Sequence, residues 1–422
     1  MSAVAVGEQA DRPSTYREAL RSREFRGLVV AQVLSEWGDH IARVALASLV
    51  LRRTDSAFLA VLAFVVSFLP AVFGSALLAS FADRLPRKVV ILACDLARAV
   101  VVLVIALLAV ASTPVWVLLG LLLVAEVFTA PFEAAQRAVV PDVLIDPRTY
   151  LAGTGLMRVL YQLDQVIGIC LAGVVIYAVG ERGGLLLDAL TFALSFAVIA
   201  TTLRWRPATR EDGAPRTSLL TDFRAGWRLV FDDPALKALV LLGWSASIFL
   251  IAPEAVALAY ARADGATAAT GAALMASIPA GAALGAHAVG RLGPMRQLRS
   301  IVPLAVLTCL PLLATCVAPP WWVALLLWFA SGLGQGFMIP LIATVNLVSP
   351  ATFRGRVNGL AAAGFSVTTA ATFLLAGLLA DLTSPAVAVT AAGVLGLAMI
   401  GVVHHSWPRG AIRRAAAKVY AT

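Results

Sequence analysis

Charged residues are scarce in this chain of 422 residues: Asp, Glu, Lys and Arg make up 14% of it, against 60% hydrophobic residues. Soluble globular domains contain roughly 25% charged and about 45–50% apolar residues. A chain this long, with a mean hydropathy of +0.89, cannot hide its apolar side chains behind a water-facing shell. The composition therefore excludes an ordinary soluble enzyme and a disordered protein.

Cysteine and histidine are also rare, with four of each. The cysteines all lie inside apolar runs, where small buried residues are expected rather than disulfide partners or metal ligands: Cys94, Cys170, Cys309 and Cys316. The sequence contains neither a phosphate-binding glycine loop nor a zinc-type histidine motif, so ATP-driven transport and metalloprotease chemistry have no support. We expect no catalytic residue, no metal and no cofactor.

Long apolar runs dominate the sequence instead. A helix crosses a bilayer with roughly 20 mostly apolar residues, and twelve stretches meet this requirement. They are residues 25–51, 57–80, 89–111, 115–139, 150–179, 185–203, 236–261, 268–290, 300–318, 321–345, 357–380 and 386–406. Gly183 and Gly184 are expected to form the turn between the fifth and sixth stretches. The sequence predicts an all-α membrane protein with twelve transmembrane helices.

The formal net charge of +9 is distributed unevenly along the chain. Arginine and lysine are concentrated in both tails and in alternate connections, whereas the opposite connections contain only Arg52, Arg53, Arg182 and Arg262. The positive-inside rule then places both termini in the cytoplasm. Residues 1–24 lack an apolar signal-peptide core, so we expect no cleavage. The positive charge follows the topology, and we expect no nucleic-acid partner.

One long polar segment, residues 204–235, divides the chain into two groups of six helices. The predicted domains are residues 1–24 as a cytoplasmic tail, 25–203 and 236–406 as helical bundles, 204–235 as a linker and 407–422 as a second tail. Apolar residues around Trp227 recur at helical spacing in the linker, which predicts an amphipathic helix on the inner membrane surface. A solvated linker is the alternative.

Landmarks in the two bundles indicate an internal duplication. Pro131 and Pro340 are 209 residues apart, and Arg84 and Arg291 are 207 residues apart. Both copies have the same orientation, which is the parallel-repeat pattern of a transporter. In the second bundle, glycines spaced along two of the stretches predict close helix contact: Gly281, Gly285, Gly332, Gly334 and Gly336.

Several motifs resemble those of the major facilitator superfamily. The segment from Phe81 to Lys88, preceded by Gly74, resembles the family signature between helices two and three, with Pro86 where glycine is more usual. Further motifs are similar to the drug (macrolide-type) efflux and siderophore-exporter branch: Trp37 to Asp39, Asp95 to Arg98, Pro131 to Asp142, Asp222 to Leu236 and Arg354 to Val357. The resemblance implies two pseudo-symmetric six-helix halves that alternate access around a central site.

Helix five departs from this branch at two positions. The segment from Gly168 to Gly173 resembles the antiporter motif, but Ile169 replaces its proline, and Gly153 stands where the branch commonly has asparagine. The first departure weakens the inference of antiport.

Charges inside the apolar stretches cost roughly 2.5–3.5 kcal/mol each at mid-bilayer, so they are expected to face a cavity or a partner. At helical spacing they form stripes on helices one, four and five, with five candidates for proton coupling: Asp39, Glu126, Glu36, Glu133 and Asp164. Asp39 and Glu126 lead because a rise of about 1.5 Å per residue places both near mid-membrane. We expect Arg158 to pair with Glu126 or Glu133, and Arg43 with Asp39. The alternative is that these groups form fixed structural pairs.

Two further groups of residues have candidate roles. Those expected to line a substrate cavity are Arg43, Trp37, Arg158, Tyr161, Gln165, Glu254 and Gln335. Glu254 either contacts a cationic substrate or lies at the outer rim. Those expected to form a cytoplasmic gate between the halves are Asp83, Arg84, Arg87, Lys88, Asp95 and Arg98. For Arg87 and Lys88 the alternative is a role in topology alone.

These observations predict a secondary active transporter that exports an amphipathic drug or natural product in exchange for protons, and not an enzyme. Its expected partners are a small-molecule substrate, protons and the lipid bilayer, and we expect a monomer. Alternatives with the same fold are a siderophore exporter, a lysophospholipid or lipid flippase and a small-molecule importer. A membrane sensor or an intramembrane lipid-modifying enzyme is the alternative from a different class. The composition, rich in arginine and alanine, indicates a bacterial plasma membrane.

Overall fold

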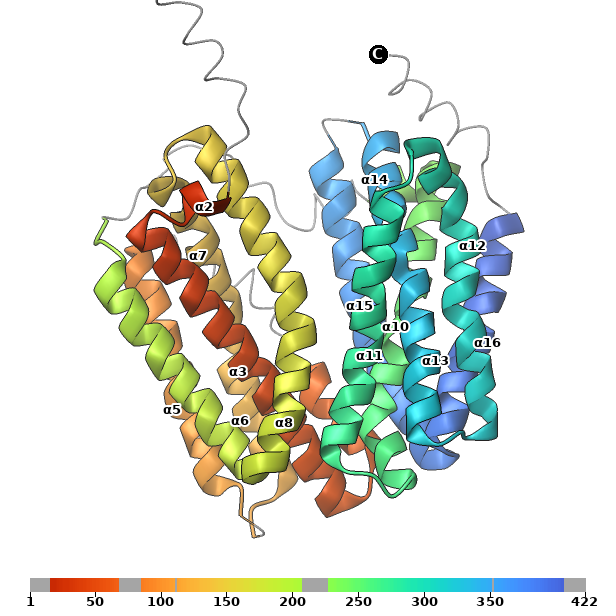
Figure 1. The fold of residues 1–422 in the computed structure, drawn as a ribbon, viewed down its shortest axis with the longest axis horizontal. Helices are drawn as coiled ribbons and strands as arrows, with labels where there is room; N and C mark the ends of the chain where they lie inside the picture. The colour runs from red at the N-terminus through yellow and green to blue at the C-terminus, as the bar shows by residue number, and fades with distance from the viewer. Residues whose placement is uncertain (1–15, 68–84, 111, 207–226, 351–352, 406–422) are drawn as a thin grey trace, which may run out of the picture. The chain divides into compact units, whose positions relative to one another are not determined.

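The computed structural model describes residues 16–67, 85–110, 112–206, 227–350 and 353–405, and within these ranges the regular structure is entirely helical (Figure 1). The first part of the chain forms α2 (Tyr16–Ala19), α3 (Arg23–Thr54), an unlabelled helix Ala57–Ser67, α5 (Arg87–Leu108), α6 (Val115–Val127), α7 (Thr129–Val143) and α8 (Pro147–Thr202). Each of the first six predicted stretches overlaps one of these helices, which confirms the all-α prediction there.

The second part of the chain is equally helical. It forms α10 (Pro234–Ala263), α11 (Ala268–Gly290), α12 (Pro294–Leu313), η1 (Ala314–Val317), α13 (Trp321–Gly334), η2 (Gln335–Phe337), α14 (Met338–Val348), α15 (Arg354–Leu382) and α16 (Pro385–His405). Across the described residues, nine helical segments are long and apolar enough to cross a membrane. Pro131 and Pro340 each occupy the third position of their helices, α7 and α14.

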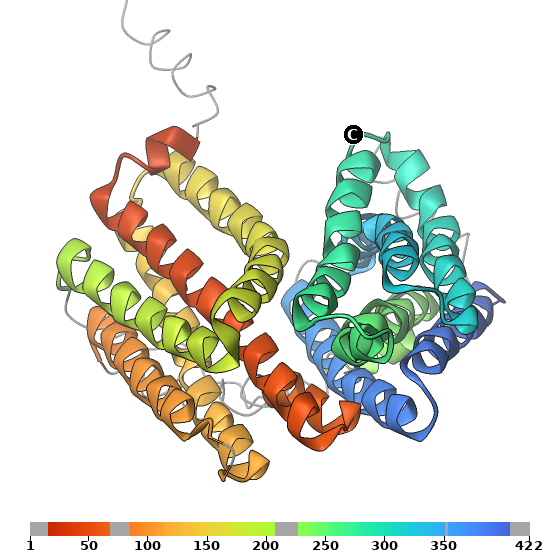
Figure 2. The same ribbon diagram turned by 60° about the horizontal axis from the view of Figure 1, so that its bottom comes forward.

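Local sequence explains where several helices begin and turn. Asp233 precedes Pro234, and its carboxylate accepts hydrogen bonds from the first free amides of α10, which is the standard start of a helix. Helix α8 consists of two arms joined at Gly180, whose φ of 71° is readily available only to glycine (Figures 1 and 2). The turn predicted at Gly183 and Gly184 is therefore wrong, because these residues continue the second arm as helix.

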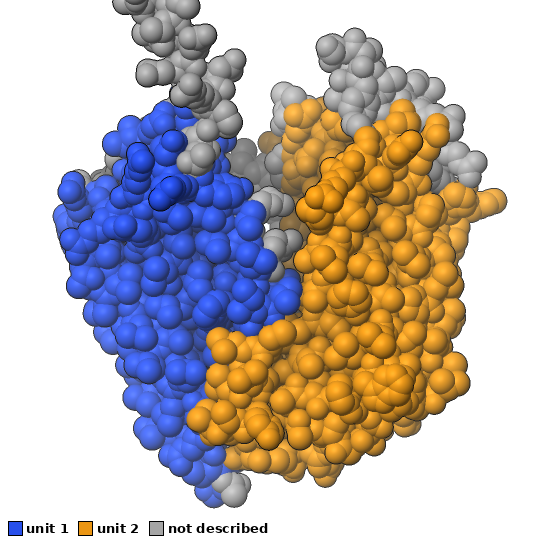
Figure 3. Space-filling view, viewed as in Figure 1, with its two compact units in different colours: residues 1–42, 69–168, 182–211 blue, residues 43–68, 169–181, 212–422 orange. Residues whose placement is uncertain are grey.

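The chain divides into two compact units, which Figure 3 colours separately. Unit 1 comprises Met1–Ala42, Leu69–Gly168 and Arg182–Glu211, and unit 2 comprises Arg43–Phe68, Ile169–Glu181 and Asp212–Thr422. Two segments from the first half of the sequence, Arg43–Phe68 and Ile169–Glu181, thus group with the second half of the chain. The predicted linker lies mostly at residues 207–226, outside the described residues, but residues 227–232 are helical.

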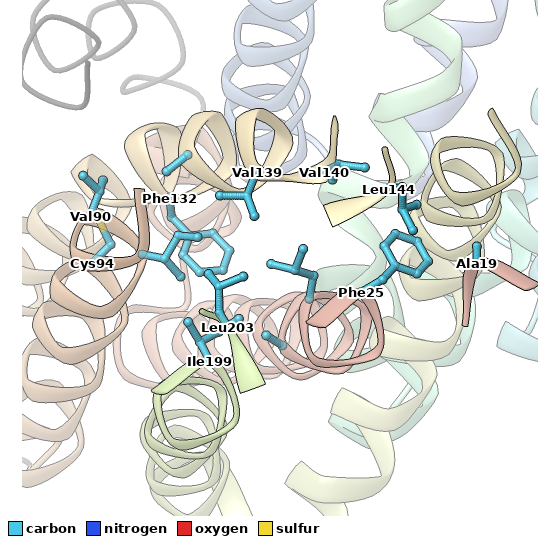
Figure 4. Packing of buried hydrophobic residues seen from close by; sticks show 14 residues of the cluster. Ala19, Phe25, Val90, Cys94, Phe132, Val139, Val140, Leu144, Ile199 and Leu203 are labelled. Carbon is cyan, nitrogen blue, oxygen red and sulfur yellow. The ribbon is translucent and has the colours of Figure 1, made fainter. Parts of the chain in front are cut away.

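The core of unit 1 brings together four helices. Buried residues of α3, α5, α7 and α8 pack in one cluster, which Ala19 of the short helix α2 joins (Figure 4). Phe25 and Phe132 are among its large side chains, and both are almost fully buried. This apolar cluster fixes how the polar faces of the same four helices meet.

Unit 2 contains a close helix seam between α11 and α13. A methyl group added at Gly281 would lie 2.2 Å from the carbonyl oxygen of Phe329, and one at Gly285 would lie 2.1 Å from that of Leu333. The backbones therefore touch without intervening side chains, which confirms the close contact predicted from the glycine spacing. In the same unit, the Trp227 ring stacks on Phe231 with centroids 4.2 Å apart.

Candidate functional site

A cavity of about 830 Å³ lies within unit 1 between α3, α5, α7 and α8. Five charged side chains line it: Glu36 and Asp39 from α3, Arg98 from α5, and Glu133 and Arg137 from α7. Tyr161 of α8 is also in the lining. Some residues from each of the polar stripes predicted on helices one, four and five therefore line one cavity. Arg98 also lines the cavity, although the sequence predicted it as part of the cytoplasmic gate.

Arg98 is the most deeply buried cation of the cavity wall, with 2% of its side chain exposed. It forms a salt bridge with Asp95, one helical turn earlier on α5, at 2.8 Å, and lies 3.9 Å from a carboxylate oxygen of Asp39. Ser195 of α8 donates a hydrogen bond of 2.7 Å to the other oxygen of Asp95. Arg98 thus joins a carboxylate on the cavity wall to one buried behind it.

Aromatic rings and a glycine hold this arrangement in place. The guanidinium of Arg98 lies 4.2 Å from the ring centroid of Phe132 and 4.3 Å from that of Phe192, which is cation–π distance for both rings. Gly38 allows α3 to approach the second arm of α8, since a methyl group there would lie 2.1 Å from Asp188. The next residue along α3 is Asp39, the partner of Arg98.

The carboxylates of the fourth predicted stretch have different surroundings. Glu133 forms a salt bridge with Arg137 one turn later on α7, on the cavity wall. Glu126 is 6% exposed on α6, receives a hydrogen bond of 3.2 Å from Thr129 and does not line the cavity. The side chain of Arg158 lies outside the described residues, so its expected pairing with these glutamates stays a prediction.

Asp164 lies on α8 apart from the cavity lining, with 2% of its surface exposed. One of its oxygens accepts a hydrogen bond of 2.8 Å from the indole nitrogen of Trp37 on α3. The other has no hydrogen-bond partner among the described residues. One turn further along both helices, His40 packs against Gly168, which tightens the same contact. Trp37 therefore positions a buried carboxyl.

The remaining cavity candidates are not among the residues that line this cavity. Arg43 belongs to unit 2, where it interacts electrostatically with Glu254 of α10. Gln335 is half-buried in unit 2 at the start of η2, and Gln165 is exposed on α8. Asp39 forms a salt bridge with Arg98 at 3.9 Å, and its expected pairing with Arg43 stays a prediction.

The contacts of the predicted gate residues lie within unit 1. Arg87 forms a salt bridge of 2.5 Å with Asp142 near the end of α7. Lys88 donates hydrogen bonds to the carbonyl oxygens of Ala200 and Leu203, where a cation stabilises the C-terminus of α8. Asp83 and Arg84 lie outside the described residues. These contacts connect the start of α5 to the C-terminal ends of α7 and α8.

Sequence analysis missed two polar residues of the second arm of α8. Ser195 and Asp188 are both fully buried. They lie in the sixth apolar stretch, where a charged residue such as Asp188 is itself evidence of a functional or structural role. Among the described residues, no group of three or more His, Cys, Asp and Glu side chains is arranged to hold a metal ion.

Known sequences related to this chain are transporters by name. The profile of the Major Facilitator Superfamily matches residues 28–345. The uncharacterized MFS-type transporter YkuC of Bacillus subtilis (strain 168) is 26% identical over 231 residues, which are 53% of this chain and 53% of YkuC. YfmI of the same organism, also an uncharacterized MFS-type transporter, is 23% identical over 242 residues, or 54% of this chain and 58% of YfmI. The match spans about half the length of these curated relatives.

Solved structures share the fold over almost the whole chain. A mutant of the nucleoside transporter NupG superposes with a TM-score of 0.71 over 91% of this chain and 100% of that one, at 13% identity. A bacterial homolog of the human lysosomal transporter Spinster gives a TM-score of 0.60 over 94% and 95% of the two chains, at 16% identity. Identities this low establish the fold alone. With the profile match over most of its length, the chain belongs to the Major Facilitator Superfamily.

Proposed function

We propose that this protein is a proton-coupled exporter of an amphipathic small molecule that works by alternating access in a bacterial plasma membrane. The observation that carries the proposal is the polar cavity of unit 1 between α3, α5, α7 and α8. Its volume of about 830 Å³ falls within the range of roughly 300–1,000 Å³ that drug-sized ligands occupy. The phosphate-binding and metal motifs that would indicate another energy source are not in the sequence.

The lining of the cavity suits both a proton and an amphipathic substrate. Three carboxylates, Glu36, Asp39 and Glu133, face two guanidinium groups, Arg98 and Arg137. Acidic groups that outnumber cations inside a membrane protein are the usual carriers of protons in transporters. The phenol of Tyr161 and the phenyl ring of Phe132 add apolar surface to the same wall.

The transmembrane proton gradient would supply the energy. Each proton that moves through 100 mV releases about 2.3 kcal/mol, and a pH difference adds to this. Asp39 is the leading proton carrier because it lies on the cavity wall with 15% of its side chain exposed and has a cation at 3.9 Å. Glu36, Glu126, Glu133 and Asp164 are secondary candidates.

The direction of transport and the substrate class separate this proposal from its alternatives. Efflux rests on the motifs that resemble the drug and siderophore exporters, whereas the solved neighbours include proteins named for nucleosides and peptides. A siderophore exporter, a lipid flippase and an importer all remain compatible with the same fold. The proposal includes protons and a small-molecule substrate as partners, and a monomeric protein.

The test is transport in liposomes with an internal pH dye and an imposed proton gradient. A macrolide, a fluorescent dye and a siderophore would be added in turn to wild type, Asp39→Asn and the matched control Asp146→Asn. Asp146 caps the exposed start of α8, and asparagine caps equally well. We expect substrate-triggered proton movement in wild type and the control and its loss in Asp39→Asn. Substrate movement without any proton flux in wild type would refute the proposal.

A further inference from the structure

We propose that Asp164 is a second proton site, which holds its proton in this structure, and that Trp37 is its positioning residue. The inference rests on the proposed proton coupling and adds to it a site outside the cavity lining. Asp164 is 2% exposed and lies near the middle of the first arm of α8. Trp37 lies near the middle of α3, and its indole nitrogen donates a hydrogen bond of 2.8 Å to Oδ1 of Asp164.

The second oxygen of Asp164 indicates the charge of the group. Oδ2 is shielded from solvent and has no hydrogen-bond partner, and no cation of the described residues forms a salt bridge with this carboxyl. A buried carboxylate needs a cation or several hydrogen-bond donors, and without them the group is neutral. A single indole donor does not meet that need. The proton therefore belongs on Oδ2, and Oδ1 is the carbonyl oxygen that accepts the hydrogen bond from Trp37.

The cavity of unit 1 gives this proton a short route. Glu36, which precedes Trp37 on α3, and Tyr161, one turn before Asp164 on α8, both line the cavity. A small separation of α3 and α8 would bring cavity water to Oδ2. The proton would then pass to that water, and the carboxylate would gain the donors that the closed contact denies it. The reverse transfer, from cavity water to Oδ2, reloads the site.

The hydrogen bond joins α3 to α8 shortly before both helices leave unit 1. Helix α3 passes into unit 2 after Ala42, and α8 does so after Gly168, so Trp37 and Asp164 each lie less than two turns before these points. Between them, a methyl group added at Gly168 would lie 2.6 Å from Cδ2 of His40, which shows how closely the helices pack. The neutral acid suits this closed contact and the carboxylate does not. Proton release is therefore linked to a rearrangement of two helices that connect the units.

A variant of Asp164 isolates this group from its charged surroundings. Asparagine has the same shape, still accepts the hydrogen bond from Trp37 and cannot carry the proton. The other charged or titratable groups in the middle of the surrounding helices are Glu36, Asp39, His40 and Arg43 on α3, Asp95 and Arg98 on α5, Glu126 on α6, Glu133 and Arg137 on α7, and Arg158, Tyr161 and Asp188 on α8. Asp164→Asn leaves all of these in place.

Infrared spectroscopy of the purified protein tests the protonation directly, because a protonated carboxyl has a carbonyl stretching band that a carboxylate lacks. At neutral pH, subtraction of the Asp164→Asn spectrum from that of wild type should leave such a band. The same subtraction with the exposed helix cap Asp146→Asn should leave none. In Trp37→Phe the band should move to higher frequency, because Oδ1 loses its donor. Trp244→Phe, which removes an indole bound to the carbonyl of Ala361, is the matched control and should leave the band unchanged.

Two infrared results would overturn the proposal. If the wild-type and Asp164→Asn spectra agree in this region, Asp164 is a carboxylate. If Trp37→Phe leaves the band in place, Trp37 does not position the acid. Should Asp164→Asn fail to fold, the comparison of Trp37→Phe with Trp244→Phe still decides, since the band should move in the first variant alone.

Transport in liposomes tests whether this proton moves with substrate. The ratio of protons to substrate, taken from the gradient at which net flux stops, should fall by one in Asp164→Asn while gradient-driven accumulation persists. An unchanged ratio overturns the proposal. A wild type without any proton coupling refutes the proposed function but leaves the infrared band, so the two failures are distinguishable.

Discussion

The seam between α11 and α13 gives a direct test of packing in unit 2. In Gly281→Ala, the new methyl group would lie 2.2 Å from the carbonyl oxygen of Phe329 and 3.0 Å from the Cα of Gly332, where ordinary contact begins at 3.4 Å. Both neighbours are backbone atoms, so the strain cannot be relieved by a rotating side chain, and the helices must separate. Overpacking of this kind costs about 1–3 kcal/mol.

The assay is thermal unfolding of the purified protein in detergent, with Gly401→Ala as the matched control. Gly401 lies inside α16, and nothing lies within 4 Å of a methyl group added there. Alanine favours a helix over glycine by roughly 0.5–1 kcal/mol, so the control should unfold at the wild-type temperature or slightly above it. We expect Gly281→Ala to unfold several degrees lower. Equal unfolding temperatures for the two variants would refute the close seam.

Two further predictions concern the ends of helices. Asp381 accepts hydrogen bonds from Ser56, Ala57 and Phe58 at 2.5–3.2 Å. Asp381→Ala should therefore destabilise the protein by about 1 kcal/mol and speed amide exchange at residues 57–60, whereas Asp381→Asn should retain most of the cap. Equal amide exchange in the two variants would contradict this role of Asp381. Burial opposes ionisation of Glu24, but hydrogen bonds and charges from Arg206 and Arg204 outweigh it and hold the pKa of that carboxyl below its ordinary 4.5. Its stabilisation is therefore present above the unfolded-state pKa and lost as pH falls through the folded one. Glu24→Gln should lower the unfolding temperature at pH 7, and the deficit should shrink as the pH falls below about 4. A deficit that does not change with pH would contradict the pairing.

The apolar runs were sufficient to predict the helices, because the cost of an unpaired backbone in lipid leaves little other choice. The position of a turn is harder to predict. Gly183 and Gly184 look like the stronger breaker, but helix tolerates both, and the chain turns at Gly180, where φ is 71°. Which glycine supplies the turn depends on how the two arms of α8 pack, and that is not a local property.

The stripes of charge predicted which faces meet at the cavity, but not which groups pair. Arg98 lies 11 residues after the start of α5 at Arg87, which is roughly 16 Å along a helix. This length of helix separates Arg98 from the predicted gate residues Arg87 and Lys88 at the start of α5. Its contact with Asp39 depends on how α3 and α5 pack against each other, a tertiary feature that spacing along one helix cannot reveal. The same holds for the hydrogen bond from Trp37 to Asp164.

The central claim, that Asp39 couples substrate movement to protons, is tested most directly by comparing two transport modes of one variant. Substrate exchange between equal concentrations across a liposome membrane needs binding and translocation but no net proton flux. Accumulation driven by a proton gradient needs coupling as well. Asp39→Asn should retain exchange near the wild-type rate and lose gradient-driven accumulation. If Asp39→Asn accumulates substrate as wild type does, the carboxylates of the cavity are structural pairs and the account is wrong.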